Sequence, residues 1–113
     1  IDWKSNYISR GMNTFCTPSN YISLNLKDEM IKHHYPLQSH LYLLALHRLL
    51  KWRLKDYKPE KHLGGFIYFF IRGLPNIKAI KKLNPQIEPP GIYISKAPLN
   101  RIKYLDNLFN YGN

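Results

Sequence analysis

An aspartate and a lysine lie two residues apart near the start of the sequence, in Asp2-Trp3-Lys4. Because side chains alternate between the two faces of a β-strand, a strand over residues 1–4 places both charges on one face, about 7 Å apart along the backbone. This arrangement suits metal-assisted phosphodiester hydrolysis, in which the carboxylate holds Mg²⁺ and the lysine orients water or stabilises developing charge. The same tripeptide is also typical of a solvated charge pair on an edge strand.

Gln38 and Tyr42 form a second pair whose spacing fits one face of a helix. Four residues apart, they are neighbours on one face of an α-helix. An amide and a phenol placed together can contact a phosphate or the catalytic carboxylate, provided that the helix packs beside the strand carrying Asp2. The alternative is an ordinary polar boundary between core and solvent.

The remaining reactive residues favour no other chemistry. Four histidines fall within fifteen positions: His33, His34, His40 and His47. No two of them have the spacing of a metal-binding helical pair, so we interpret them as surface or phosphate-facing residues. Cys16 has no neighbouring base that would make it a nucleophile. Gly64-Gly65 lacks the spacing and the Lys-Ser/Thr ending of a Walker loop, which argues against ATP binding by that route.

The hydrophobic pattern predicts the elements that position these residues. A short helix is expected over residues 24–34, with Ser23 as its N-cap, and a longer helix over residues 37–57, opened by Pro36. The apolar face predicted for the longer helix consists of Leu37, Leu41, Leu44, Ala45 and Leu49.

The second half of the chain is predicted to add two strands and a helix. Residues 66–71 read as a strand buried on both faces, and residues 91–95 as a short strand. A last helix begins at Pro98, with Ile102, Leu105 and Phe109 on one face. Residues 5–20 and 74–90 are expected to be loops. This order predicts an α/β or α+β layer arrangement with strands missing on the N-terminal side.

Composition limits the class of protein. The 113 residues suffice for one domain, and the net charge of +10 favours polyanionic partners, although part of it fits the Lys-rich and Asn-rich usage of an A+T-rich genome. A single cysteine excludes an intrachain disulfide. The longest apolar run, residues 66–71, is too short to span a membrane. Lacking an initiating Met and a signal peptide, the chain is expected to be cut from a longer one.

Four segments together resemble a known family: Asp-Trp-Lys-Ser-Asn at residues 2–6, the stretch Tyr-Pro-Leu-Gln-Ser-His-Leu-Tyr at residues 35–42 with the helix that follows, His-Leu-Gly-Gly-Phe-Ile-Tyr-Phe-Phe-Ile-Arg-Gly at residues 62–73, and Gly-Ile-Tyr at residues 91–93. Their order and spacing resemble the C-terminal nuclease domain of the RecB family, the beta subunits of bacterial exodeoxyribonuclease V. The resemblance runs from Ile1 to about Phe109.

The resemblance implies a restriction-endonuclease-like (PD-(D/E)xK) core, a mixed sheet flanked by helices, of which residues 1–113 would be the C-terminal part of one incomplete, N-terminally truncated domain. Asp2 would be a Mg²⁺ ligand and Lys4 the catalytic lysine. The backbone carbonyl of Trp3 would be a further metal ligand, and Gln38 with Tyr42 the pair beside the site that contacts DNA phosphate. ATP would be bound only by helicase domains absent from this chain.

The implied function is Mg²⁺-dependent DNA exonuclease activity within an ATP-dependent helicase-nuclease, in double-strand-break repair and recombination. Its implied partners are DNA and the RecC and RecD subunits, in the bacterial cytoplasm, with no membrane. The family's upstream histidine and aspartate would precede Ile1, so we expect the isolated residues to have negligible nuclease activity. The alternative is an inactive remnant or a basic module that binds DNA or subunits without catalysis. An RNA-binding module ranks lower, since the aromatic-Gly signatures of common RNA folds are missing.

Overall fold

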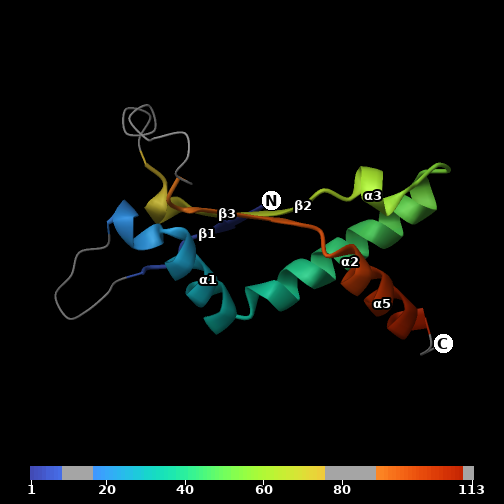
Figure 1. Cartoon of the computed structure of the whole chain (residues 1–113), viewed down its shortest axis with the longest axis horizontal. Coiled ribbons are helices and arrows are strands. Elements are labelled where there is room, and N and C mark those ends of the chain that lie inside the picture. The colour runs from blue at the N-terminus through green and yellow to red at the C-terminus, as the bar shows by residue number, and fades with distance from the viewer. Residues whose placement is uncertain (9–16, 76–88, 111–113) are drawn as a thin grey trace. The chain divides into compact units, whose positions relative to one another are not determined.

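The computed structural model describes residues 1–8, 17–75 and 89–110 (Figure 1). Cys16 and most of the loop predicted over residues 74–90 lie outside these ranges. The described elements are β1 (Asp2–Lys4), the 3₁₀ turn η1 (Pro18–Tyr21), α1 (Ser23–Lys32), α2 (Tyr35–Arg53), α3 (Pro59–His62), β2 (Gly65–Phe70), the 3₁₀ turn η2 (Ile71–Gly73), β3 (Ile92–Lys96) and α5 (Leu99–Asn110).

A three-stranded mixed sheet has the order β1-β2-β3. β1 runs parallel to β2, with Asp2 opposite Tyr68 and Lys4 opposite Phe70. At the end of β2 the backbone N–H of Phe70 donates to the carbonyl of Gly91, just before β3, at 2.7 Å. The predicted α/β class with helices flanking a mixed sheet is therefore confirmed.

The chain divides into two compact units, Ile1–His33 with Ile67–Ile94 and His34–Phe66 with Ser95–Asn113. In the first unit α1 lies beside the strands (Figure 1). Apolar side chains from η1, α1 and β2 form its buried part. These are Tyr21, Leu26, Met30, Tyr68 and Phe70, each at most 2% exposed.

The strand predicted over residues 66–71 is present as β2, but only one of the two faces predicted to be buried is fully buried. Tyr68 and Phe70, which share one face of β2, are buried, whereas Ile67 and Phe69 on the other face are only partly buried. Ile71 has left the strand for η2 and is 54% exposed. An unbroken apolar run thus did not mean burial on both faces, because in the described chain only one face of β2 is fully covered.

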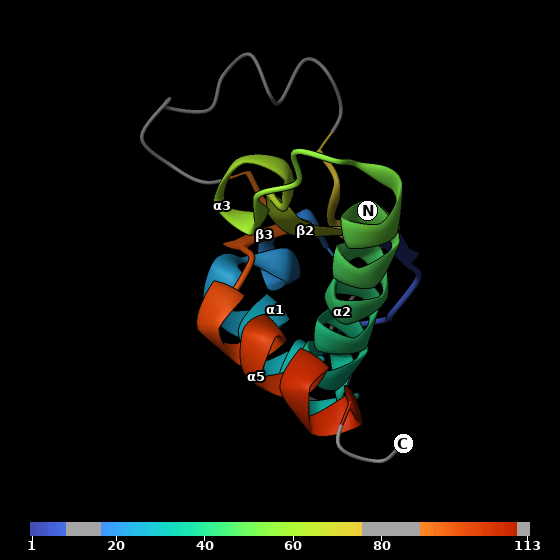
Figure 2. The ribbon, with the colours of Figure 1, turned by 90° about the vertical axis from the view of Figure 1, so that its right-hand side faces the viewer.

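In the second unit α5 lies across α2 (Figure 2). The two helices pack together with the segment before β2 through a core of four buried side chains. These are Leu43 and Leu44 of α2, Leu63 of that segment and Ile102 of α5. On α5, Ile102 is buried as predicted, but Phe109 is 53% exposed. Burial of these apolar side chains is the main stabilising term for the unit.

The predicted apolar face of α2 is right for Leu44, which is buried, and wrong for its other residues. Leu37, Leu41 and Leu49 are 63%, 44% and 49% exposed, and the buried positions of the helix are instead Ser39, Leu43, Leu44 and His47. Leucines occur on nearly every side of α2, so their spacing fits more than one face. The side that packs is set by the contact with α5.

The helix boundaries also differ from the prediction. Pro36 occupies the first turn of α2 as expected, but the helix ends at Arg53 rather than near residue 57, because Leu54 adopts an extended backbone. Ser23 is the first residue of α1, and Ile22 is its N-cap. No helix in residues 1–8, 17–75 and 89–110 is long and apolar enough to cross a membrane.

Candidate active site

Asp2 and Lys4 point to the same face of β1, as their spacing predicted. The Lys4 Nζ lies 3.0 Å from the Asp2 Oδ2, with the side chains 12% and 30% exposed respectively. Alternation along the strand brings the two together, and the parallel pairing with β2 fixes the strand. The result is a close ion pair in which the Asp2 carboxylate remains accessible to solvent.

β2 supports both faces of β1. On the face of the ion pair, the Lys4 Nζ lies 5.2 Å from the centre of the buried Tyr68 ring, a cation–π contact. On the opposite face Trp3 stacks on Phe69, with ring centres 4.8 Å apart. These contacts hold the lysine stem and limit the rotamers of the ammonium group.

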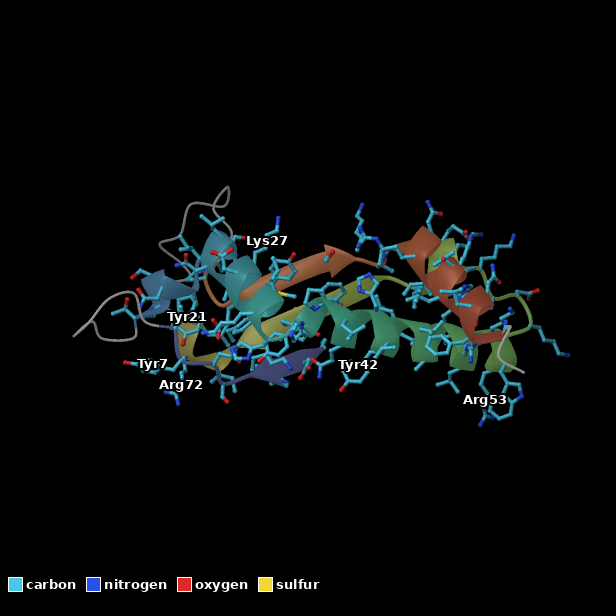
Figure 3. All side chains as sticks on the ribbon, turned by 90° about the horizontal axis from the view of Figure 1, so that it is seen from below. Tyr7, Tyr21, Lys27, Tyr42, Arg53 and Arg72 are labelled. Carbon is cyan, nitrogen blue, oxygen red and sulfur yellow. The ribbon has the colours of Figure 1, made fainter. Side chains whose placement is uncertain are left out.

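The segment after Lys4 is held in place by hydrogen bonds and ring contacts from residues distant in sequence. The Arg72 Nε donates to the carbonyl of Ser5 at 3.0 Å, and its guanidinium lies 5.8 Å from the centre of the Tyr7 ring (Figure 3). The Tyr21 hydroxyl donates to the carbonyl of Asn6 at 2.6 Å. Sequence reasoning missed these contacts, because nothing in local spacing relates Arg72 to Ser5.

A glycine pair packs under Tyr21. A Cβ added to Gly73 would lie 2.3 Å from the Tyr21 Cβ, and one added to Gly91 would lie 2.7 Å from the Gly73 carbonyl carbon. Gly91 also has a φ of +81°, a conformation that favours glycine. The backbone N–H of Gly91 donates to the Tyr21 carbonyl at 2.9 Å. Both glycines thus allow the close packing that keeps the end of β2 in place.

Gln38 and Tyr42 are neighbours on α2, as predicted. The Gln38 Nε2 donates to the Tyr42 hydroxyl at 3.5 Å, and Tyr42 is 60% exposed. Figure 3 shows the Tyr42 side chain extending away from the helix. This pair belongs to the second unit and the Asp2/Lys4 pair to the first. A joint action of the two pairs on one phosphate stays a prediction.

The donor atoms near Asp2 fit Mg²⁺ in kind but are few. A carboxylate and a backbone carbonyl, such as that of Trp3, are the oxygen ligands that Mg²⁺ prefers. Among the residues that the structure describes, no three His, Cys, Asp or Glu side chains gather closely enough to hold a metal ion. Asp2 therefore offers a carboxylate that belongs to no group of three such side chains within the described residues.

The second unit contains a polar cluster that the sequence did not reveal. His47 is 5% exposed, so the interpretation of the histidines as surface residues is wrong for this one. Its Nδ1 lies 2.7 Å from the Tyr57 hydroxyl, and its Nε2 lies 3.7 Å from the Asp106 carboxylate. The Arg48 Nε donates to Asp106 at 2.6 Å. Arg48 and Asp106 are 58 residues apart in the sequence, so no local sequence pattern predicts their contact.

The cluster shifts the acidity of its members. Burial alone would raise the pKa of Asp106, but the hydrogen bond and charge of Arg48 act in the opposite direction. The electrostatic effects of the nearby Lys51 and His47 add to that of Arg48, and the pKa of Asp106 is lowered overall. The pKa of the Tyr57 hydroxyl is raised, first by burial and then by the nearby Glu60 charge. Asp106 therefore stays charged and Tyr57 stays neutral at pH 7.

The fold and the site define an α/β protein that carries a carboxylate and a lysine paired on one strand face. No protein-family model matches the chain. Three of its relatives are RecBCD enzyme subunits RecB. The protein of Mycobacterium tuberculosis (strain CDC 1551 / Oshkosh) is 32% identical over 112 residues, which cover 99% of this chain and 9% of that protein.

The protein of Escherichia coli (strain K12) is 37% identical over 109 residues, covering 96% of this chain and 8% of its own length. That of Buchnera aphidicola subsp. Schizaphis graminum is 41% identical over 97 residues, covering 77% and 8%. The chain belongs to the RecB family. It spans only 8% to 9% of the length of these relatives.

Proposed function

We propose that the chain is part of the Mg²⁺-dependent DNA exonuclease domain of an ATP-dependent helicase-nuclease. It would act in double-strand-break repair and homologous recombination by hydrolysing phosphodiester bonds, within a restriction-endonuclease-like (PD-(D/E)xK) core. The observation that carries this proposal is the Asp2/Lys4 ion pair, 3.0 Å long and held on one face of β1. Similarity to subunits of the RecBCD enzyme supports it.

Each residue of the pair has a distinct role in this proposal. Asp2, together with the Trp3 carbonyl, would hold Mg²⁺, which when bound lowers the pKa of water and offsets phosphate charge. Lys4 presents its ammonium beside that carboxylate, where it can donate a hydrogen bond to the attacking water or to a phosphate oxygen. The Tyr68 ring supports the lysine and keeps its charge at the site.

The remaining parts of the proposal concern binding. Gln38 and Tyr42 would contact DNA phosphate through their amide and hydroxyl groups, which lie at hydrogen-bonding distance from each other. The net charge of +10 favours a polyanion such as DNA. RecC and RecD would be the partner subunits, and ATP would act at helicase domains elsewhere in the enzyme. The bacterial cytoplasm would be the place of action.

A chimaeric enzyme tests this function. The segment of E. coli RecB that matches this chain would be replaced by it, since 37% identity covers 96% of the chain. The chimaera would be assembled with RecC and RecD. We expect DNA degradation that requires both Mg²⁺ and ATP. An enzyme that assembles and hydrolyses ATP on DNA, yet leaves the DNA intact, would show that the chain does not support nuclease function.

One observation favours a second candidate, a basic DNA-binding or subunit-binding module without catalysis. Asp2 is a single carboxylate, and no three-residue metal site occurs within the described residues. Mg²⁺ held by so few protein oxygens binds weakly. The 113-residue chain by itself should therefore have negligible nuclease activity. Efficient Mg²⁺-dependent degradation of DNA by the purified chain, lost in Asp2→Ala, is the result that rules this out.

A further inference from the structure

The C-terminal end of α2 presents an exposed aromatic and basic surface. Trp52 is 73% exposed, and the Arg53 guanidinium carbon lies 4.2 Å from the centre of its ring. Figure 3 shows Arg53 at this end of the helix. The neighbouring Lys51 side chain is 64% exposed. We call these three residues, together with the two hollows described next, the Trp52 surface.

Two open hollows adjoin these residues within the second unit. One, of about 310 Å³, is lined by Trp52, Lys51 and Arg48, and by Asn110 of α5. The other, of about 360 Å³, is lined by Lys51 and by Lys103 of α5. Because Lys51 and Asp106 line both, the hollows form one continuous edge between α2 and α5.

The charge of this edge is positive. Asp106 lines both hollows, but its side chain is only 8% exposed and accepts a hydrogen bond from Arg48 at 2.6 Å. The cations reach solvent further, with the Arg48 side chain 42% and the Lys103 side chain 51% exposed. Lys103 donates to the exposed Glu60 carboxylate at 2.9 Å, and the four cations Arg48, Lys51, Arg53 and Lys103 against the two carboxylates of Asp106 and Glu60 leave the edge positive. An approaching ligand therefore meets ammonium and guanidinium groups beside an exposed indole that carries the Arg53 guanidinium over its ring.

We propose that the Trp52 surface binds single-stranded DNA, with one base stacked on Trp52 and the adjacent phosphates against Lys51, Arg53 and Lys103. An exposed indole can stack on any base, and cations that follow the backbone add sequence-independent affinity. In a duplex the bases already stack on one another, so the surface favours an unpaired strand. This inference deepens the proposed function, because it assigns a path for the DNA on the second unit.

Fluorescence tests the stacking directly. Trp3 and Trp52 are the two tryptophans of the sequence, so in Trp3→Phe the emission reports Trp52 alone. The full chain would be titrated with an oligothymidylate of about 12 nucleotides in EDTA, where no hydrolysis occurs. We expect the emission to be quenched and the affinity to fall as salt rises. Emission that stays constant while the oligonucleotide binds would overturn the proposal.

Affinities of variants test the surface independently of that signal, using a labelled oligothymidylate and anisotropy. Trp52→Ala should weaken binding about tenfold. Tyr104→Ala is the matched control, because Tyr104 is also an exposed aromatic, 64% exposed on α5, and lines neither hollow. Its affinity should match the unaltered chain. Circular dichroism would establish that both variants are folded.

Two results would contradict the proposal: equal affinities of Trp52→Ala and Tyr104→Ala, or competition by polyglutamate as strong as by the oligonucleotide, which would indicate an acidic protein partner. Binding in EDTA does not depend on cleavage. Loss of cleavage in an Asp2 variant therefore tests the proposed function, and loss of binding in the Trp52 variant tests the surface.

Discussion

Among the residues that the structure describes, Asp2 and Asp106 form close ion pairs, and their carboxylates differ in exposure to solvent. The Asp2 side chain is 30% exposed beside Lys4, whereas the Asp106 side chain is 8% exposed and receives Arg48 at 2.6 Å. A carboxylate open to solvent can take a metal ion or water, but a buried one bound by arginine is committed to holding helices together. We therefore propose a chemical role for Asp2 and a stabilising role for Asp106.

The second assignment predicts a pH-dependent stability. The pKa of Asp106 is lowered from its ordinary 3.8, so its contribution is present above that value and is lost as pH falls through the folded-state pKa. Asp106→Asn should lower the free energy of unfolding at pH 7 by about 1–2 kcal/mol, less than for a fully buried pair because Arg48 is partly exposed. Urea unfolding followed by circular dichroism measures both effects.

The comparison variant is Asp28→Asn, which alters an exposed residue of α1 and should stay within about 0.5 kcal/mol of the unaltered chain. Below pH 4 the unaltered chain should lose stability faster than Asp106→Asn. Parallel pH profiles for these two chains would refute the role given to Asp106.

Spacing in the sequence revealed some residue pairs and hid others. Asp2 with Lys4 and Gln38 with Tyr42 are close along one element, so the periods of strand and helix were enough to predict that each pair lies together. Arg48 meets Asp106 only because α5 packs on α2. Such contacts depend on tertiary structure and leave no local pattern.

At the scale of elements, α2 shows why the packed side of a leucine-rich helix is hard to predict. The structure buries Leu44 at 6% exposure and leaves Leu49 at 49%, although the predicted face included both. Leu44→Ala should cost about 2–5 kcal/mol, since it opens a cavity in the core with Ile102, whereas Leu49→Ala should cost under about 1 kcal/mol. Chemical denaturation of the two variants measures this. Equal losses would mean that both leucines are packed.

The glycine contacts at the end of β2 predict a second element-scale effect. In Gly73→Ala the added Cβ would meet the Tyr21 side chain at 2.3 Å, and Tyr21 or η2 must shift. We expect a loss of about 1–3 kcal/mol in thermal unfolding.

Gly64→Ala is the matched change, because no heavy atom lies within 4 Å of a Cβ added there. Its melting temperature should remain near that of the unaltered chain. If Gly73→Ala melts no lower than Gly64→Ala, the close packing under Tyr21 does not contribute to stability. The sequence alone does not show which of the two glycines is crowded, because the contact with Tyr21 depends on tertiary packing.

At the scale of the whole molecule, the proposed catalytic pair and the proposed DNA surface belong to different units. The first unit carries Asp2 and Lys4 on β1, and the second carries the Trp52 surface along α2 and α5. The chain also spans only 8% to 9% of its RecB relatives. Activity is therefore best measured in an assembled enzyme, where the rest of the protein is present.

The most direct test of the Asp2/Lys4 site is the rate of DNA cleavage relative to ATP hydrolysis in the chimaeric RecB assembled with RecC and RecD. Asp2→Asn in that enzyme should reduce Mg²⁺-dependent cleavage by at least about a hundredfold, because the metal loses its carboxylate, while ATP hydrolysis stays unchanged. The matched Asp28→Asn should cleave normally. Cleavage by Asp2→Asn at the rate of Asp28→Asn would contradict the assignment of Asp2 to the active site.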